Sequence, residues 1–234
     1  MKFHVNRDVL ADAGAWTARI LPSRPAVPVL GGILLDAHGE DLTLSAFDYE
    51  VSARATVEAQ VAEPGRTLIP GRVLAEITKS LPDHPVEIVT DGAEAILTCG
   101  SAEFGLHTMP VDEFPALPEM PPRIGAVGGG LLATAVAQVA PSASRDDTLP
   151  MLTGIRMDIS GHNVTLAATD RYRIAAREFL WHPERPDVTA AAMVSARVLV
   201  EIARTLRAGE VSIALGDGVI GFESVGRRTT VRLM

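Results

Sequence analysis

Two aspartates, Asp48 and Asp170, are the residues whose type and setting could support acid–base chemistry. They end two similar stretches, "LTLSAFD" and "VTLAATD", and a pair of carboxylates can act as general acid and general base. Their equivalent places in two copies of one pattern favour a single local role that is repeated. Aspartate often accepts hydrogen bonds from the backbone of a following turn. We therefore expect both residues to stabilise turns, and we predict that the chain is not an enzyme.

Metal and nucleotide chemistry have little support in the sequence. Cys99 is the single cysteine, and no two of the six histidines have a spacing typical of metal ligands. These histidines are His4, His38, His84, His107, His162 and His182. The glycine-rich stretch "VGGGLLATA" lacks the Gly-Lys-Ser/Thr of a phosphate-binding P-loop, which favours a flexible entry to a helix. We predict no catalytic residue, no metal and no cofactor.

The stretch "TDRYRI", residues 169–174, places cationic, aromatic and aliphatic side chains next to one another. One interpretation is an exposed strand whose arginines are solvated. The other is the edge of a peptide-binding site, because tyrosine and arginine are favoured anchors in interfaces. The residues alone leave both interpretations open.

A long internal repeat organises the chain. "RVLAEITKSL" at 72–81 and "RVLVEIARTL" at 197–206 share six of ten residues, and Pro28–Asp48 matches Pro150–Asp170 at ten of 21 positions without a gap. Both segments occur in the same order, which indicates a duplication. In the repeated helix, Arg72 and Lys79 match Arg197 and Arg204. A spacing of seven residues puts each pair on a similar helical face, which is either a solvated face or a shared electropositive one.

The composition places limits on function. The chain has 47% apolar residues and a net charge of −8, which argues against a conventional DNA-gripping surface, because phosphate neutralisation supplies most non-specific affinity. A local basic face remains compatible with this charge. The single cysteine suits a reducing compartment, and the start "MKFHVNRD" lacks the apolar core of a signal peptide. We predict a cytoplasmic protein.

The order of the patterns predicts an α+β fold of two tandem domains. Each copy contains two amphipathic helices and about seven or eight strands, most of them expected to be antiparallel. The predicted helices cover 7–21, 72–81, 129–143 and 197–206. Five prolines between Met109 and Ile124 indicate an extended connector. We predict domains at 1–115 and 124–234, joined by a linker at 116–123.

With these motifs in view, the chain resembles the bacterial sliding clamp family, the β subunit of DNA polymerase III. The resemblance rests on "MKFHV", "SRPAVPVLGGILL", "HTMPVDEFPALP", "RDDTLPMLTGI" and "ATDRYRIAAREF". It implies the DNA-clamp fold, in which six similar domains form a ring around duplex DNA. Such a ring tethers the replicative polymerase without reading the DNA sequence. Encirclement is topological, so an acidic protein can hold DNA with a basic lining alone.

The resemblance also assigns roles to particular residues. The residues expected to face DNA are Arg24, Arg72, Lys79, Arg145, Arg197 and Arg204. A pocket for short peptides of polymerase, clamp loader and repair proteins is expected from Leu152, Thr169, Arg171, Tyr172, Arg173 and Ile174. The edge around Phe104 and Leu106 is expected to meet another subunit. Many relatives have a small residue and a histidine where this chain has Arg171 and Tyr172, which puts the peptide preference in doubt.

The family normally has three such domains, whereas the repeat here occurs twice. One explanation is a truncated form that lacks the third domain and half of the pocket. The other is a ring that self-associates from three two-domain chains. An alternative function is a non-encircling module that binds clamp partners without loading on DNA.

Overall fold

Nine strands and two helices recur in each half of the chain, which a computed structural model describes from Met1 to Met234. The chain divides into unit 1, Met1–Leu117, and unit 2, Pro118–Met234. The division lies inside the predicted linker. No helix is long and apolar enough to cross a lipid bilayer.

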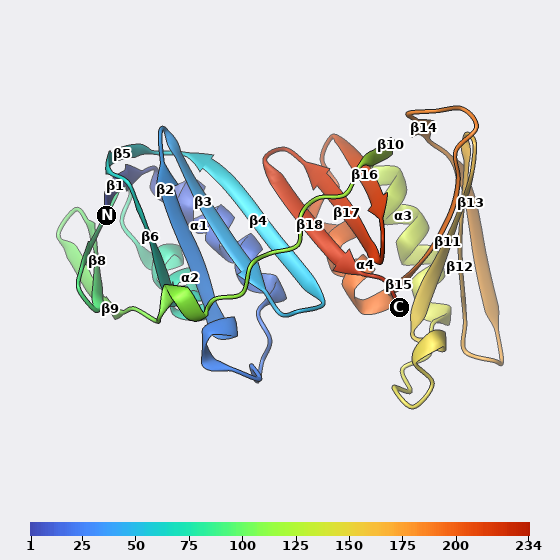
Figure 1. The fold of residues 1–234 in the computed structure, drawn as a ribbon, viewed down its shortest axis with the longest axis horizontal. Coiled ribbons are helices and arrows are strands. Elements are labelled where there is room, and N and C mark those ends of the chain that lie inside the picture. The colour runs from blue at the N-terminus through green and yellow to red at the C-terminus, as the bar shows by residue number, and fades with distance from the viewer. The chain divides into compact units, whose positions relative to one another are not determined.

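Unit 1 contains two antiparallel sheets and two helices, which Figure 1 shows in blue to green. The strand orders are β5-β1-β7-β8-β9 and β4-β3-β2-β6. The elements in chain order are β1 (Lys2–Val5), α1 (Arg7–Thr17), η1 (Ala18–Ile20), η2 (Pro28–Gly31), β2 (Gly32–His38), β3 (Asp41–Phe47), β4 (Val51–Glu58), β5 (Gln60–Glu63), β6 (Gly65–Pro70), α2 (Gly71–Ser80), β7 (Val86–Asp91), β8 (Glu94–Cys99), β9 (Ala102–His107) and η3 (Val111–Glu113), where η marks a 3-10 turn.

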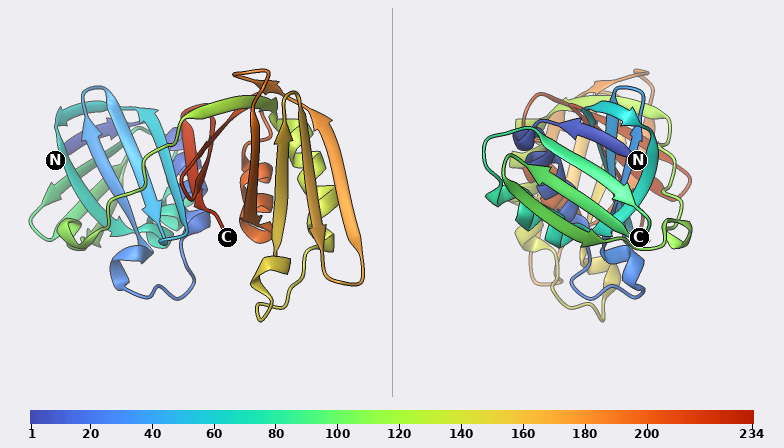
Figure 2. Two further views of the ribbon diagram at one scale, coloured as in Figure 1. Left: turned by 45° about the vertical axis from the view of Figure 1, so that its right-hand side comes forward. Right: turned by 90° about the vertical axis from the view of Figure 1, so that its left-hand side faces the viewer.

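Unit 2 repeats this arrangement with the strand orders β14-β10-β16-β17-β18 and β13-β12-β11-β15. Figure 2 shows α3 and α4 against the second of these sheets. The elements are β10 (Arg123–Gly128), α3 (Gly129–Val139), η4 (Ala140–Ser142), η5 (Pro150–Leu152), β11 (Gly154–Ser160), β12 (Asn163–Thr169), β13 (Ile174–Leu180), β14 (His182–Pro183), β15 (Thr189–Ser195), α4 (Ala196–Thr205), β16 (Glu210–Gly216), β17 (Val219–Ser224) and β18 (Arg227–Arg232).

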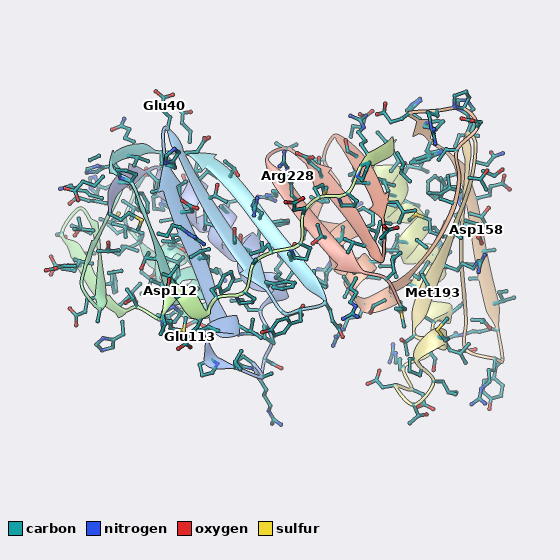
Figure 3. The ribbon with its side chains drawn as sticks, in the orientation of Figure 1. Glu40, Asp112, Glu113, Asp158, Met193 and Arg228 are labelled. Atoms are coloured by element: carbon teal, nitrogen blue, oxygen red, sulfur yellow. The ribbon has the colours of Figure 1, made fainter.

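The β4-β3-β2-β6 sheet of unit 1 separates two apolar layers, as the alternating directions of the side chains on β2 show. Ile33 and Leu35 point into the main core with the helices, whereas Leu34 belongs to a smaller cluster. Successive side chains of a strand point to opposite faces, so this cluster lies on the face away from α1 and α2. In unit 2, Arg156 and Asp158 alternate instead with buried neighbours and form an ion pair of 2.7 Å. Asp158 lies on β11 in Figure 3.

The repeated helices α2 and α4 bury small and apolar residues and expose charged ones, as their pattern predicts. In α2 the buried residues are Gly71, Leu74, Ala75 and Thr78. Val73, which helical spacing groups with the apolar residues Leu74 and Ile77, is 43% exposed. Thr78 is buried on this helix, and its hydroxyl donates to the carbonyl of Leu74 at 2.9 Å, so the helix satisfies the polar group itself.

The glycine-rich start of α3 is a close contact and not the flexible entry that the sequence favours. A Cβ on Gly129 would lie 2.1 Å from the carbonyl oxygen of Leu206, whereas a Cβ on Gly130 would meet nothing within 4 Å. The backbone N–H of Gly129 also donates to the carbonyl of Gly209 at 2.8 Å. Gly129 therefore lets the start of α3 approach the end of α4.

Alanine at these two adjacent glycines is expected to have opposite effects on the free energy of unfolding. Gly129→Ala lowers it by about 1–3 kcal/mol, because backbone must move to admit the methyl group. Gly130→Ala raises it by about 0.5 kcal/mol, because it reduces the entropy of the unfolded chain at a helical position with free space. Urea unfolding of both variants checks this pair. Equal effects would contradict the close approach of α3 and α4.

Candidate DNA-facing and peptide-docking surfaces

The exposed faces of α2 and α4 carry the repeated basic residues. Arg72 and Lys79 are exposed on α2, and Arg197 and Arg204 are exposed on α4. The spacing of seven residues separates the members of each pair by about 10 Å along the helix. Each face also has one acidic residue, Glu76 or Glu201, so each keeps a net charge of +1 from two cations and one anion.

Hydrogen bonds hold some of these cations in place. Arg72 donates from Nη2 to the carbonyl oxygen of Leu21 at 2.9 Å, and Arg204 lies 3.2 Å from a carboxylate oxygen of Glu201. The first contact ties α2 to the start of the loop that carries Arg24. Neither contact uses all five donors of a guanidinium group, so both residues can also donate to phosphate.

The two loop arginines have different surroundings. Arg24 is exposed between η1 and η2, in the stretch "PSRPAV" that contains no acidic residue. Arg145 is exposed between η4 and η5, with the two carboxylates of Asp146 and Asp147 directly after it in the chain. Arg24 therefore fits a phosphate-facing role better than Arg145 does.

The other two helices do not share the basic face. The exposed residues of α1 include Asp8 and Asp12, and α3 has no charged residue at all. The sequence repeat was strongest in α2 and α4, and positive charge recurs in those helices alone. The amphipathic patterns of α1 and α3 gave no such signal.

The stretch 169–174 forms a turn between β12 and β13 that Asp170 holds together. Its Oδ1 accepts the backbone N–H groups of Tyr172 and Arg173 at 3.1 and 3.0 Å. The guanidinium of Arg173 donates from Nε to Oδ2 of Asp170 at 3.0 Å and from Nη2 to the carbonyl of Pro141 at 2.6 Å. Arg173 thus links the turn to the end of α3.

Asp48 makes the same turn in unit 1, so the prediction of a repeated turn-stabilising role is confirmed. Its Oδ1 accepts the backbone N–H groups of Glu50 and Val51 at 3.0 and 2.7 Å. In both turns the residue after the aspartate has a positive φ, 72° for Tyr49 and 80° for Arg171. Residues with a Cβ pay a steric cost in this region, which the carboxylate contacts offset.

The surroundings of Asp170 set a testable pKa. Partial desolvation opposes ionisation, but the N–H groups of Tyr172 and Arg173 and the guanidinium of Arg173 outweigh it, so the pKa of Asp170 is lowered. The ordinary aspartate value is about 3.9. Above that pH the carboxylate is ionised and stabilises the folded turn fully. This contribution to stability is lost as the pH falls through the lowered pKa of Asp170 in the folded protein.

A carbon-detected NMR titration is expected to show Asp170 titrating below about 3.9. Arg173→Ala is expected to raise the pKa of Asp170, because it removes the neighbouring positive charge. A wild-type value at or above the ordinary one would contradict the geometry of the turn.

Apolar side chains project from and beside this turn. Tyr172 is 91% exposed, Ile174 is 74% exposed and Met151 is 60% exposed. Leu152 and Thr169 are half-buried, and the backbone carbonyl of Leu152 accepts from Ser144 at 2.8 Å. Exposed apolar side chains of this size are candidates for contact with a partner. Met151 was not identified from the sequence, and its counterpart in the first copy, Val29, is 4% exposed.

Strand β9 is a free edge of its sheet, with Phe104 and Leu106 on one face. Leu106 is 7% exposed and belongs to the main core of unit 1, and Phe104 is half-buried against that core. The side chain of Leu106 is therefore not available to another subunit. The unpaired backbone of β9 is what this edge can offer.

Comparison with known proteins matches both units to one family. Residues 1–118 match the family described as "DNA polymerase III beta subunit, N-terminal domain", and residues 127–234 match "DNA polymerase III beta subunit, central domain". The beta sliding clamp of Pseudomonas aeruginosa bound to griselimycin has a similar structure, with a TM-score of 0.91, 28% identity and coverage of 100% of this chain and 64% of that chain.

Sequence relatives agree with this result. The chain is 57% identical to the beta sliding clamp of Streptomyces coelicolor, over 100% of this chain and 64% of the relative. It is 47% identical to the beta sliding clamp of Micrococcus luteus, over 98% of this chain and 75% of the relative. The chain thus spans 64% of the length of the Streptomyces relative. With two domain matches that together span both units, the chain belongs to the DNA polymerase III beta subunit family, the beta sliding clamps.

Proposed function

We propose that this chain is the N-terminal and central part of a DNA sliding clamp that encircles duplex DNA and tethers the replicative polymerase. The observation that carries the proposal is the recurrence of two exposed cations at matching positions of α2 and α4. Both helices bury their other face in the unit that carries them. The net charge of −8 supports topological retention over a tight surface grip, since a tight grip needs a broadly basic surface.

The proposed DNA contacts are weak and independent of sequence. Arg24, Arg72 and Lys79 in unit 1, with Arg197 and Arg204 in unit 2, can donate to phosphate oxygens, which carry no base information. Arg145 belongs to this set by resemblance, although its acidic neighbours reduce its attraction for phosphate. The protein does no chemistry on DNA in this proposal and works in the cytoplasm, where a buried free thiol such as Cys99 stays reduced.

The turn 169–174 is proposed to dock peptides of polymerase, clamp loader and repair proteins. Tyr172, Ile174 and Leu152 offer apolar contacts, and Arg171 and Arg173 offer positive charge. A partner binds as an extended segment that buries a few apolar anchors. Arg173 is a positioning residue here, because its contacts with Asp170 and Pro141 orient the turn.

A polymerase-derived peptide is expected to bind the wild-type chain in calorimetry, and absence of binding would overturn the docking assignment. The mass of the native protein in solution tests whether two-domain chains complete a ring by themselves. A trimer of two-domain chains supports six domains from three chains. A monomer contradicts that arrangement.

A further inference from the structure

The segment Met109–Leu117 packs on unit 1 in the manner of a bound peptide. It lies against the face of the β4-β3-β2-β6 sheet that points away from the helices. There Phe114 is 9% exposed and forms an apolar cluster with Val29, Leu34, Phe47 and Leu68. Met109, Val111 and Leu117 pack at the margin of this cluster. The sequence predicts only a proline-rich connector at this place.

Backbone contacts fix the start of the segment. The N–H of Met109 donates to the carbonyl of Leu68 on β6 at 2.8 Å, and the N–H of Phe114 donates to Val111 at 3.1 Å. The turn η3 between them carries Asp112 and Glu113, which are exposed (Figure 3). The segment therefore combines strand-like pairing, apolar anchors three residues apart and an acidic outer side.

The backbone contact that fixes the start of the segment in unit 1 has an equivalent in unit 2. The N–H of Met234 donates to the carbonyl of Met193 at 3.0 Å, and both residues lie 125 positions after Met109 and Leu68. A Cβ on Gly154 would meet the sulfur atoms of Met193 and Met234 at 2.8 and 2.9 Å. In unit 1, a Cβ on Gly32 would likewise lie 2.6 Å from side-chain carbons of both Leu68 and Met109.

The surfaces beside these contacts differ in their exposure. Val29 is 4% exposed, whereas its counterpart Met151 is 60% exposed. Leu30 is 2% exposed, and its counterpart Leu152 is half-buried. The surface that unit 1 buries under its own segment thus corresponds to the surface beside the docking turn of unit 2.

We propose that unit 1 has a second docking groove, which the chain's own segment Met109–Leu117 keeps closed. The groove takes an extended peptide with apolar anchors spaced as Val111, Phe114 and Leu117. This inference rests on the proposed docking at the equivalent surface of unit 2. It predicts that unit 1 binds no free peptide at this surface while its own segment is in place.

Tethering accounts for the closed state. A segment joined to its binding site by a short stretch of chain has an effective concentration in the millimolar range. A free peptide at micromolar concentration cannot compete with it. Weakening the segment's main anchor removes this advantage, while the groove formed by Val29, Leu34 and Leu68 stays in place.

The test uses the full chain with Phe114→Ala and a synthetic peptide of residues 109–117 as the probe. NMR signals of the methyl groups of Val29, Leu34 and Leu68 report on the groove. In the variant the peptide is expected to shift these signals saturably, back towards their wild-type positions. In the wild type they are expected not to move. Ala116→Ser, which changes an exposed residue of the same segment, is expected to behave as the wild type does.

Two results would overturn the proposal. The first is a variant whose groove signals do not respond to the peptide, and the second is a wild type whose signals respond equally. Val111→Ala provides a milder opening if Phe114→Ala does not fold. Because all three reporter residues lie in unit 1, failure of peptide docking at unit 2 leaves this readout unchanged, and the two proposals can fail separately.

Discussion

Replacing both Arg197 and Arg204 by glutamate is expected to reduce the slope of log affinity for duplex DNA against log salt by about 1.8, because two phosphate contacts at about 0.9 each are lost. Over a fourfold rise in salt, the variant then loses about tenfold less affinity than the wild type does. At low salt its binding is correspondingly weaker. Fluorescence anisotropy with a labelled duplex at several salt concentrations measures both effects.

A charge-matched control separates local contact from overall charge. Arg177 and Arg185 are exposed outside the four helices, and changing both to glutamate also takes the net charge from −8 to −12, two units for each residue. The control is expected to retain most of the wild-type salt dependence. If both double variants lose the same slope, the face of α4 is not a DNA contact.

Arg173→Ala is expected to weaken binding of a polymerase-derived peptide by about 30-fold, which corresponds to the 2 kcal/mol typical of an interface hot spot. The substitution removes the ion pair with Asp170 and the hydrogen bond to Pro141, so the turn is no longer held against the end of α3. Tyr172 and Ile174 then lose their fixed direction towards the peptide.

Calorimetry with the same peptide measures this loss, and Arg177→Ala on the neighbouring strand β13 is the matched control. The control is expected to bind as the wild type does. Circular dichroism of both variants shows whether the fold is kept. Binding of Arg173→Ala within twofold of the wild type would exclude the turn as the positioning element.

The duplication made much of the fold predictable. The two helices per copy, the antiparallel hairpins and the turn role of Asp48 and Asp170 all follow from patterns that occur twice. The strands number nine in each unit, slightly more than the seven or eight expected, because strands as short as β5 in unit 1 and β14 in unit 2 have no clear alternation.

Other features depend on contacts between residues that are distant in the sequence. The proline content of Met109–Leu117 predicts an extended chain, but not that Phe114 packs against Leu68. Likewise, the residues around "VGGG" do not show that Gly129 packs closely against the carbonyl of Leu206. At the docking turn, the sequence identified Arg173 but not the carbonyl of Pro141 to which it donates. Helix periodicity grouped Val73 with the apolar face of α2, but this residue is 43% exposed, whereas Thr78 is buried and donates to its own helix.

Encirclement is tested most directly by retention of the native protein on DNA of different topology. The protein is loaded onto a nicked circular plasmid, and the complex is passed through gel filtration before and after a single cut of the plasmid. The proposed clamp is expected to stay on the circle and to leave once the DNA is linear, because topology and not affinity holds it. Equal retention on circular and linear DNA would show surface binding and would contradict the proposed function.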